Sequence, residues 1–179
     1  MDMADATGEG YPLVLQSGAD PSTLGGVAVC GLTTVGSVGV IAASHLIASL
    51  GLKPMGTVIH PEFPAVALIQ ESVPKHPVRV YQGEEMGVFI SEIQFPQASD
   101  FQFGNTVLEW FQKGGFDRLV IIDGLVSEDL GLKEDGDIWG VASLQSGRDA
   151  LDTVGIQRIQ QGIVTGVSGF LLAEGERQG

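Results

Sequence analysis

The stretch GGVAVCGLTTVGSVGVIAASHLIASLG, residues 25–51, decides the fold class. It opens with a continuous apolar run that contains β-branched residues and follows glycines, which is typical of a strand buried on both faces of a sheet. The chain then passes through TTVGSVG into a predicted helix over residues 37–50, and Gly51 supplies a left-handed residue where this helix ends. The segment therefore predicts a strand followed by a helix, the repeating unit of an α/β protein.

The alternation continues toward the middle of the chain. MGTVIHPEFPAVALI predicts two short strands around a proline-containing loop, and PVRVYQGEEMGVFISEI predicts a hairpin, so the sheet is expected to be mixed. A helix is predicted over residues 99–113, with Ser99 and Gln102 as a capping box and Gly114 and Gly115 as its stop. Its predicted core half contains Phe101, Phe103, Val107, Leu108, Trp110 and Phe111.

The last third of the chain predicts further elements of the same kinds. DRLVIID indicates a buried strand, SEDLGLKEDGD an exposed acidic loop, and IWGVAS a strand before a short helix capped by Ser146. GIVTGVSGFLLAEGERQG predicts a strand, a glycine turn and a helix. The expected fold class is α/β, with a mixed, mostly parallel sheet flanked by helices. Residues 1–22 are expected to be a flexible segment, and residues 23–179 a single domain.

Composition excludes several functional classes. The 179 residues carry a net charge of −13, which disfavours nucleic acids and anionic membranes as partners. The lone cysteine, Cys30, lies in an apolar run, so neither a disulfide framework nor a cysteine zinc site is expected. The beginning of the chain is acidic and polar, unlike a signal peptide, and no apolar run is long enough for a transmembrane helix. These features predict a cytoplasmic protein without a metal ion or other cofactor.

Two glycine turns are the main candidate sites. Gly36 and Gly39 stand between a predicted strand and helix, where backbone N–H groups at a helix N-terminus attract anions. The turn lacks the lysine of a P-loop and the first glycine of a dinucleotide fingerprint, so tight packing is the alternative interpretation. Gly166 and Gly169 repeat the pattern near the end of the chain. Ligands of open α/β sheets bind at the carboxyl ends of the strands, where the two turns are expected to meet.

Few polar side chains accompany these turns. The candidate pocket at the carboxyl edge is predicted to contain Gly36, Ser37, Glu62, Asp123, Gly166 and Ser168. No Ser-His-Asp set, pair of catalytic carboxylates or metal-ligand spacing can be assembled from the sequence, so no catalytic residue is assigned.

The helix predicted over residues 37–50 has two faces suited to packing. Ser37, Ile41, Ser44 and Ala48 line one side, whereas Gly39, Ala43, Leu46, Ile47 and Leu50 occupy another. A helix that is apolar nearly all round is expected to be buried on more than one side. Its second face is expected to meet either another helix of the same chain or a second subunit.

Taken in order, several segments resemble one family. GSVGVIAASHLIASL, HPEFPAVALI, PVRVYQGEEMGVFISEI, NTVLEWFQKGGFDRLVIIDGL, WGVAS and GIVTGVSGFLLAE are similar to the corresponding parts of the proteasome assembly chaperone 2 family, archaeal type. The resemblance covers about residues 25–174. It implies a sheet like those of nucleoside phosphorylases and peptidases, without their catalytic residues.

The resemblance also implies how the protein works. Members of this family self-associate and assist or bind 20S proteasomes, so a homo-oligomer and proteasome α subunits are the expected partners. Those that dock on the proteasome usually end in a tail of a hydrophobic residue, a tyrosine and one more residue. This chain ends in EGERQG, and the expectation is that it lacks the family's last strand, helix and tail. The alternative function is a nucleotide- or nucleoside-binding protein, or a hydrolase-like enzyme, that uses the two glycine turns.

Overall fold

A computed structural model of the chain describes residues 10–17, 19, 25–61, 63–94, 96–124 and 138–178. The chain divides into two compact units, Met1–Gly124 and Leu125–Gly179. The first unit contains β1 (Leu13–Leu15), β2 (Val27–Leu32), the short helix η3 (Val35–Ser37), α1 (Val38–Ser49), β3 (Lys53–Val58), β4 (Leu68–Gln70), β5 (Val73–Lys75), β6 (Val78–Gln82), β7 (Met86–Ser91), η4 (Gln97–Ser99), α2 (Asp100–Lys113) and β8 (Arg118–Ile122). The second unit contains β9 (Trp139–Gly140), α3 (Gln145–Thr153), β10 (Gln157–Arg158) and α4 (Gly166–Gln178).

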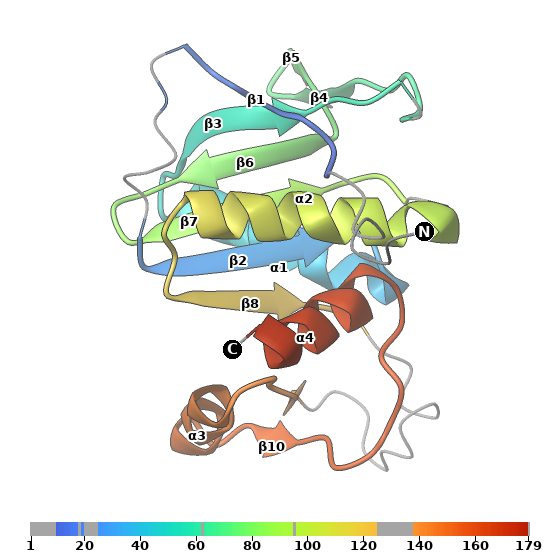
Figure 1. The fold of residues 1–179 in the computed structure, drawn as a ribbon. Coiled ribbons are helices and arrows are strands. Elements are labelled where there is room, and N and C mark those ends of the chain that lie inside the picture. Colours follow the sequence, from blue (N-terminus) through green and yellow to red (C-terminus); the bar gives the residue numbers. More distant parts are fainter. Residues whose placement is uncertain are drawn as a thin grey trace. The chain divides into compact units, whose positions relative to one another are not determined.

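A mixed sheet of six strands organises the first unit, in the order β1-β3-β6-β7-β2-β8 (Figure 1). Pairing is antiparallel from β1 to β7, and it becomes parallel where β2 lies between β7 and β8. These ladders confirm the predicted mixed sheet and the predicted hairpin of β6 and β7. The prediction that the sheet is mostly parallel is wrong, because three of its five ladders are antiparallel. β4 and β5 form a separate two-stranded hairpin, whose turn residues Glu71 and Ser72 both have positive φ.

Helices cover both faces of this sheet. In Figure 1, α2 crosses in front of the strands and α1 lies behind them. On the α1 side, Ala43 packs in a buried cluster with Val29 of β2 and with Val88 and Ile90 of β7. Because side chains alternate along a strand, the same strands present their other residues to α2. The predicted α/β class, a sheet flanked by helices, is thereby confirmed.

An aromatic cluster fills the α2 side of the sheet. Trp110 of α2 is 1% exposed, and its ring lies 5.5 Å from that of Phe89 in β7 and 4.9 Å from that of Phe116. Phe103 is also fully buried and meets Phe89 edge to face. The predicted core half of this helix is therefore correct at Phe103 and Trp110, but it is wrong at Phe101, which is 57% exposed.

The segment that decides the fold behaves largely as predicted. β2 is buried along most of its length, with Cys30 completely inaccessible. The helix runs over Val38–Ser49, one residue shorter at each end than predicted. Gly51 has φ of 61°, the left-handed conformation that glycine adopts without steric cost at a helix end.

The second unit is a small β-α-β arrangement followed by a helix. β9 and β10 pair in parallel, and α3 connects them. Gly140 of β9 lies against Leu151 of α3 so closely that a Cβ would come within 2.6 Å of the leucine side chain. The Ser143 hydroxyl donates to the carbonyl oxygen of Leu172 at 2.7 Å, which ties α4 to the loop after β9.

Two predicted helix caps are wrong. Ser99 precedes α2 but makes no side-chain hydrogen bond, because the short helix η4 leads directly into α2 and places Ser99 in a helical conformation, with φ −95° and ψ −6°. A capping serine normally has extended backbone angles. In the second unit α3 begins at Gln145, so Ser146 lies inside the first turn and Leu144 takes the N-cap position.

Two predicted strands also differ from the structure. β8 was expected to be buried, but it is the edge strand of the sheet, and its residues are exposed or half-buried. The strand expected at the start of GIVTGVSG is absent from the described segment 162–165, which is irregular, and β10 forms earlier in the chain. The predicted acidic loop over residues 127–137 lies outside the described residues. Within the segment 1–22, Leu13–Leu15 pair with β3. The prediction of one domain over residues 23–179 stays a prediction.

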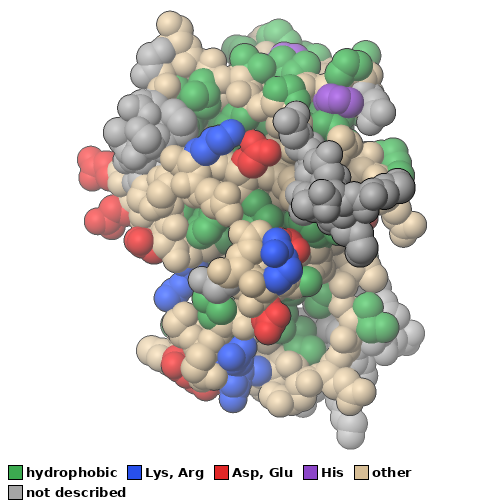
Figure 2. All heavy atoms as spheres, in the orientation of Figure 1, with side chains coloured by type: hydrophobic (Ala, Val, Ile, Leu, Met, Phe, Trp, Pro, Cys, Tyr) green, Lys and Arg blue, Asp and Glu red, His purple; other side chains and the backbone are tan. Residues whose placement is uncertain are grey.

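Charged side chains of both signs are scattered over the face that carries α2 (Figure 2). One such pair joins Lys113 to Glu109 at 3.0 Å on the exposed side of that helix. No helix among the described residues is both long and apolar enough to span a membrane.

Candidate functional site

The carboxyl ends of β7, β2 and β8 meet at one edge of the first unit's sheet, because these strands are parallel. Hydrogen bonds tie their ends together. The Thr33 hydroxyl donates to the carbonyl oxygen of Ser91 at 2.8 Å, and the backbone N–H of Gly124 donates to the hydroxyl of Thr34 at 3.3 Å. This edge is the place where open α/β sheets bind ligands.

The first glycine turn lies at this edge, between β2 and α1. Gly36 and Ser37 have φ of 67° and 53°. A left-handed conformation is easy for Gly36 but unfavourable for Ser37, whose side chain makes no capping hydrogen bond to α1. The turn therefore presents the N-terminus of a helix at the sheet edge, as the anion-binding hypothesis requires.

The space beside this turn is filled by the chain's own backbone. A Cβ on Gly39 would overlap the carbonyl oxygen of Ile122, and one on Gly124 would overlap the carbonyl oxygen of Val35. A phosphate in a glycine cradle needs open space next to the backbone N–H groups. The contacts at Gly39 and Gly124 favour the alternative interpretation of the turn, a device for close packing of α1 on the sheet. Gly36 has a different role, because it supplies the left-handed backbone conformation of the turn.

Asp123 is half-buried immediately after β8. Burial, and to a smaller degree the negative charge of Asp123, raise the pKa of the Cys30 thiol. Cys30 therefore stays protonated at neutral pH, and a buried thiol of this kind is a poor nucleophile. The one cysteine in the sequence is a core residue because it is completely buried.

The second glycine turn has the same local construction as the first. Gly166 has φ of 69°, and a Cβ on Gly169 would overlap the carbonyl oxygen of Val164. Ser168, between them, is 4% exposed. The repeat read from the sequence is thus a repeated turn, with one glycine for the left-handed conformation and one for close approach.

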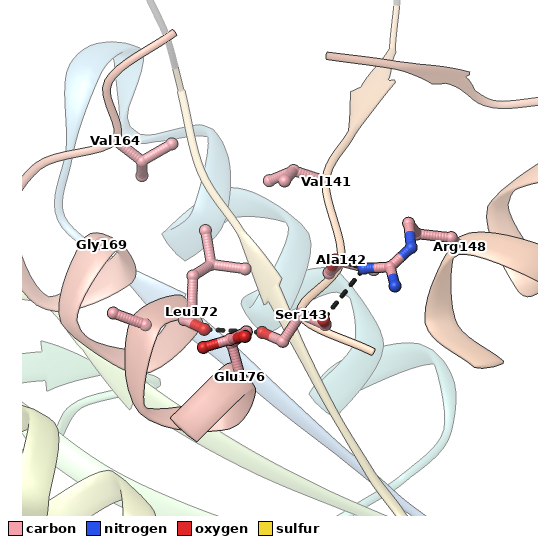
Figure 3. A pocket seen from close by; sticks show the side chains of 9 residues that line it. Val141, Ala142, Ser143, Arg148, Val164, Gly169, Leu172 and Glu176 are labelled. Atoms are coloured by element: carbon pink, nitrogen blue, oxygen red, sulfur yellow. Dashed lines mark hydrogen bonds between the residues drawn. The ribbon is translucent and has the colours of Figure 1, made fainter. Parts of the chain in front are cut away.

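A shallow pocket of about 370 Å³ lies beside this second turn. Figure 3 shows aliphatic side chains around it, with Arg148 on the α3 side and Glu176 on α4. The Arg148 guanidinium donates to the carbonyl oxygens of Ala142 and Ser143 at 3.0 and 2.9 Å. These hydrogen bonds hold Arg148 against its own backbone. Arg148 and the Ser143 hydroxyl, two of the polar groups that line the pocket, thus already have hydrogen-bond partners within the chain.

The predicted site residues fall into two sets. Gly36, Ser37 and Asp123 lie at one edge of the first unit, whereas Gly166 and Ser168 lie in the second unit. Glu62 is outside the described residues. The joint pocket that contains both glycine turns stays a prediction.

A buried ion pair, which no sequence pattern predicted, involves Arg79 of β6 and Glu92. Arg79 is 6% exposed and donates from Nε to the Tyr81 hydroxyl at 3.0 Å. Its two terminal nitrogens donate to the His76 carbonyl oxygen and to the Glu92 carboxylate. The sequence feature that could have indicated this ion pair is a single arginine between two valines, in PVRVYQ. Because every nitrogen of this guanidinium has a partner within the chain, the network is a structural one.

The described residues offer little for metal binding or acid–base chemistry. They contain no cluster of three or more histidine, cysteine, aspartate or glutamate side chains able to hold a metal ion. The His60 ring lies 4.4 Å from the Tyr11 ring and 5.9 Å from that of Phe63. Another histidine, His45, is within 3.2 Å of the Ser49 hydroxyl on the exposed side of α1.

Comparison with known proteins identifies the class of protein that carries this fold. The model of the PAC2 family matches residues 28–179. The chain therefore belongs to the PAC2 family, which confirms the resemblance seen in its sequence.

Among solved structures, the chain is similar to PbaA of Pyrococcus furiosus, described as an archaeal homolog of proteasome-assembly chaperone. The identity is 25% with a TM-score of 0.81, over 94% of this chain and 68% of PbaA. A second crystal structure of PbaA gives 26% identity and a TM-score of 0.79, over 93% of this chain and 71% of PbaA. No curated protein matches the chain in sequence.

One more distant structure has the same fold. PbaB of Pyrococcus furiosus, described as an archaeal proteasome activator, has a TM-score of 0.73 at 19% identity, over 96% of this chain and 77% of PbaB. At this identity the likeness concerns the fold alone.

Proposed function

We propose that this chain is a non-enzymatic protein-binding factor that acts in the assembly or binding of the 20S proteasome. The observation that carries the proposal is the likeness to PbaA over 94% of the chain, together with membership of the PAC2 family. Proteins of one fold often differ in function, so the proposal also depends on the chemistry of the candidate site.

The side chains at the candidate sites support a binding role over catalysis. The Cys30 thiol is buried and its pKa is raised, and Ser168 is also buried. At the first turn Gly39 packs against Ile122 and Gly124 packs against Val35, which disfavours the alternative of a nucleotide-binding protein or hydrolase. The proposed protein needs no metal ion or cofactor, because it acts through the shape and charge of its surface.

The proposed partners are a second copy of the chain and proteasome α subunits. A net charge of −13 suits a basic protein surface and disfavours nucleic acid and anionic membranes. The proposed compartment is the cytoplasm, which also keeps Cys30 reduced.

A binding experiment tests this function. Purified protein is immobilised and exposed to separately purified archaeal α subunits and to assembled 20S proteasome, with bovine serum albumin as the control. We expect saturable binding to at least one proteasome form that weakens as salt is raised. The same protein heated with ATP, adenosine or inosine is expected to melt at an unchanged temperature. Absence of proteasome binding together with a ligand-dependent rise in melting temperature contradicts the proposal.

A further inference from the structure

The outer face of α1 is an apolar surface in an acidic protein. No aspartate, glutamate, lysine or arginine occurs from residue 21 to residue 52. Three large apolar side chains on this face are exposed, Val35 by 55%, Val38 by 46% and Ile41 by 64%. His45, Ala48 and Ser49 continue the exposed row along the helix. We call these six residues the α1 stripe; Val35 belongs to η3, which leads into the helix.

Helical spacing makes the part of the stripe within α1 continuous. Val38, Ile41, His45 and Ala48 follow one another at intervals of three or four residues and Ser49 adjoins them, so these residues occupy one side of the helix. Val35 precedes the helix, separated from it by the left-handed residues Gly36 and Ser37. The opposite side contains Gly39 and Ala43, which are buried against the sheet. The His45 ring and the Ser49 hydroxyl lie 3.2 Å apart, so each already provides the other with a polar partner. The His45 Nε2 and the Ser49 hydroxyl therefore keep a hydrogen-bond partner when the stripe is covered.

Charge indicates which surface can accept another copy of this chain. Two chains of net charge −13 repel each other, and like charges brought together at an interface cost several kcal/mol. The face that carries α2 presents charged side chains (Figure 2). Glu109 and Lys113 form an exposed pair on this helix. The α1 stripe has no acidic residue, lysine or arginine. A second copy meets less repulsion there than on the face that carries α2, whereas a strongly basic partner gains no ion pair from the stripe.

The sizes of the side chains indicate an orientation. The large apolar residues lie at the N-terminal half of the stripe, and the small residues Ala48 and Ser49 lie at its C-terminal half. When two copies of the helix pack antiparallel, the large half of each meets the small half of the other. A parallel pairing sets large against large and small against small. Antiparallel pairing about a two-fold axis thus fills the interface evenly, as close packing requires.

We infer that the α1 stripe is a self-association surface, through which two copies of this chain pack antiparallel about a two-fold axis. The inference rests on the proposed function in one respect, the self-association of the chain, and adds the surface and the geometry. A helix of 12 residues is about 18 Å long, so it supplies only the centre of a standard interface. We therefore expect a weak, concentration-dependent dimer. Screening of the charge repulsion makes it stronger as salt is raised, unlike an interface built from ion pairs.

A pair of matched variants tests the surface. Ile41→Glu places a charge in the stripe, and Ile69→Glu places the same charge on the β4–β5 hairpin, where the isoleucine is 67% exposed compared with 64% at Ile41. In sedimentation equilibrium we expect the dissociation constant to rise at least about tenfold for Ile41→Glu and to stay unchanged for Ile69→Glu. Val38→Glu repeats the test at a second position, and circular dichroism verifies that each variant folds. A monomeric wild-type protein, or assembly of both stripe variants like the wild type, overturns the inference.

Cross-linking tests the geometry. Chains carrying Val38→Cys are mixed with chains carrying Ala48→Cys under mild oxidation, with each variant alone as the control. Cys30 is buried and does not compete. Antiparallel packing predicts a mixed disulfide in preference to either homodisulfide. A preference for the Val38→Cys homodisulfide indicates parallel packing and overturns the proposed arrangement.

The same variant separates this inference from the proposed function. Monomeric Ile41→Glu that still binds proteasome α subunits supports both. If the stripe variants lose self-association and the wild-type protein does not bind proteasomes, the surface is supported and the proteasome function is contradicted. Proteasome binding by a protein that never self-associates contradicts the surface alone.

Discussion

The Cα of Gly39 in α1 faces the carbonyl oxygen of Ile122 in β8 at a separation that leaves no room for a methyl group. This contact brings the first turn of the helix onto the edge strand of the sheet. It places the N-terminus of α1 beside the end of β8, where Gly124 donates to Thr34. Packing thereby explains Gly39 in TTVGSVG, whereas the left-handed backbone explains Gly36.

Gly39→Ala is expected to destabilise the first unit by about 3 kcal/mol, because a new methyl group would displace β8 or α1. Within a helix, the same substitution without a clash stabilises by up to about 1 kcal/mol. The sign of the change in unfolding free energy therefore decides between packing and open space at this position. Urea denaturation followed by circular dichroism measures it.

Gly36→Ala is the control for that variant. Its Cβ would meet nothing closer than a Val38 methyl group at 3.5 Å, so only the left-handed φ of 67° opposes the substitution. We expect a loss of about 1 kcal/mol. A loss at Gly36 larger than the loss at Gly39 contradicts the packing argument.

Glu92→Gln is expected to lower the free energy of unfolding by about 3 kcal/mol, because it leaves the buried guanidinium of Arg79 without its counter-charge. Lys113→Gln breaks the exposed pair with Glu109 and serves as the comparison. That change is expected to cost less than about 0.5 kcal/mol. Equal losses in urea denaturation argue against a special role for the Arg79 network.

Cys30 is expected to resist thiol reagents in the folded protein. Burial raises the pKa of this thiol, with a further contribution from Asp123, so the reactive thiolate does not form at neutral pH. Titration with a chromogenic disulfide reagent should yield one thiol per chain only after unfolding. Asp123→Asn should change this little, because burial is the larger cause. Rapid labelling of the native protein contradicts the prediction.

Glu174 is expected to titrate well below an ordinary glutamate. A hydrogen bond from Arg177 and a weaker contribution from the hydrogen bond of Gln178 lower the pKa of Glu174 from 4.5 to about 2. The folded protein therefore binds this proton less readily than the unfolded chain, and the stabilisation of α4 is complete above about pH 4.5 and lost as pH falls toward 2. Carboxyl NMR titration measures the midpoint. Arg177→Gln should return it toward 4.5, and an unchanged midpoint contradicts the assigned cause.

Local patterns were the most predictable part of this fold. The apolar run before Gly31, the helix after it and the left-handed Gly51 depend on neighbours in sequence, and all were predicted correctly. The edge position of β8 depends on strand order, which no local pattern contains. The cap expected at Ser99 failed because the residues just before it form a short helix of their own.

The candidate site was less predictable, because its character depends on contacts between distant residues. Gly36 and Gly39 are the glycines that the sequence singles out, but the role of Gly39 follows from Ile122, far along the chain, and that of Gly36 from its left-handed backbone. Arg79 is acceptable inside the sheet because Glu92 lies beside it after β7. The strands β9 and β10 are two residues long, too short to give a periodic signal.

The two tryptophans of the sequence are distributed one to each unit, with Trp110 in α2 and Trp139 in β9. Trp110 is enclosed by Phe89 and Phe116, whereas Trp139 is only half-buried. Intrinsic fluorescence consequently contains one emitter from α2, which packs on the six-stranded sheet, and one from the β-α-β unit. With Trp139→Phe, the remaining emission reports the melting of the sheet alone, and with Trp110→Phe it reports the smaller unit.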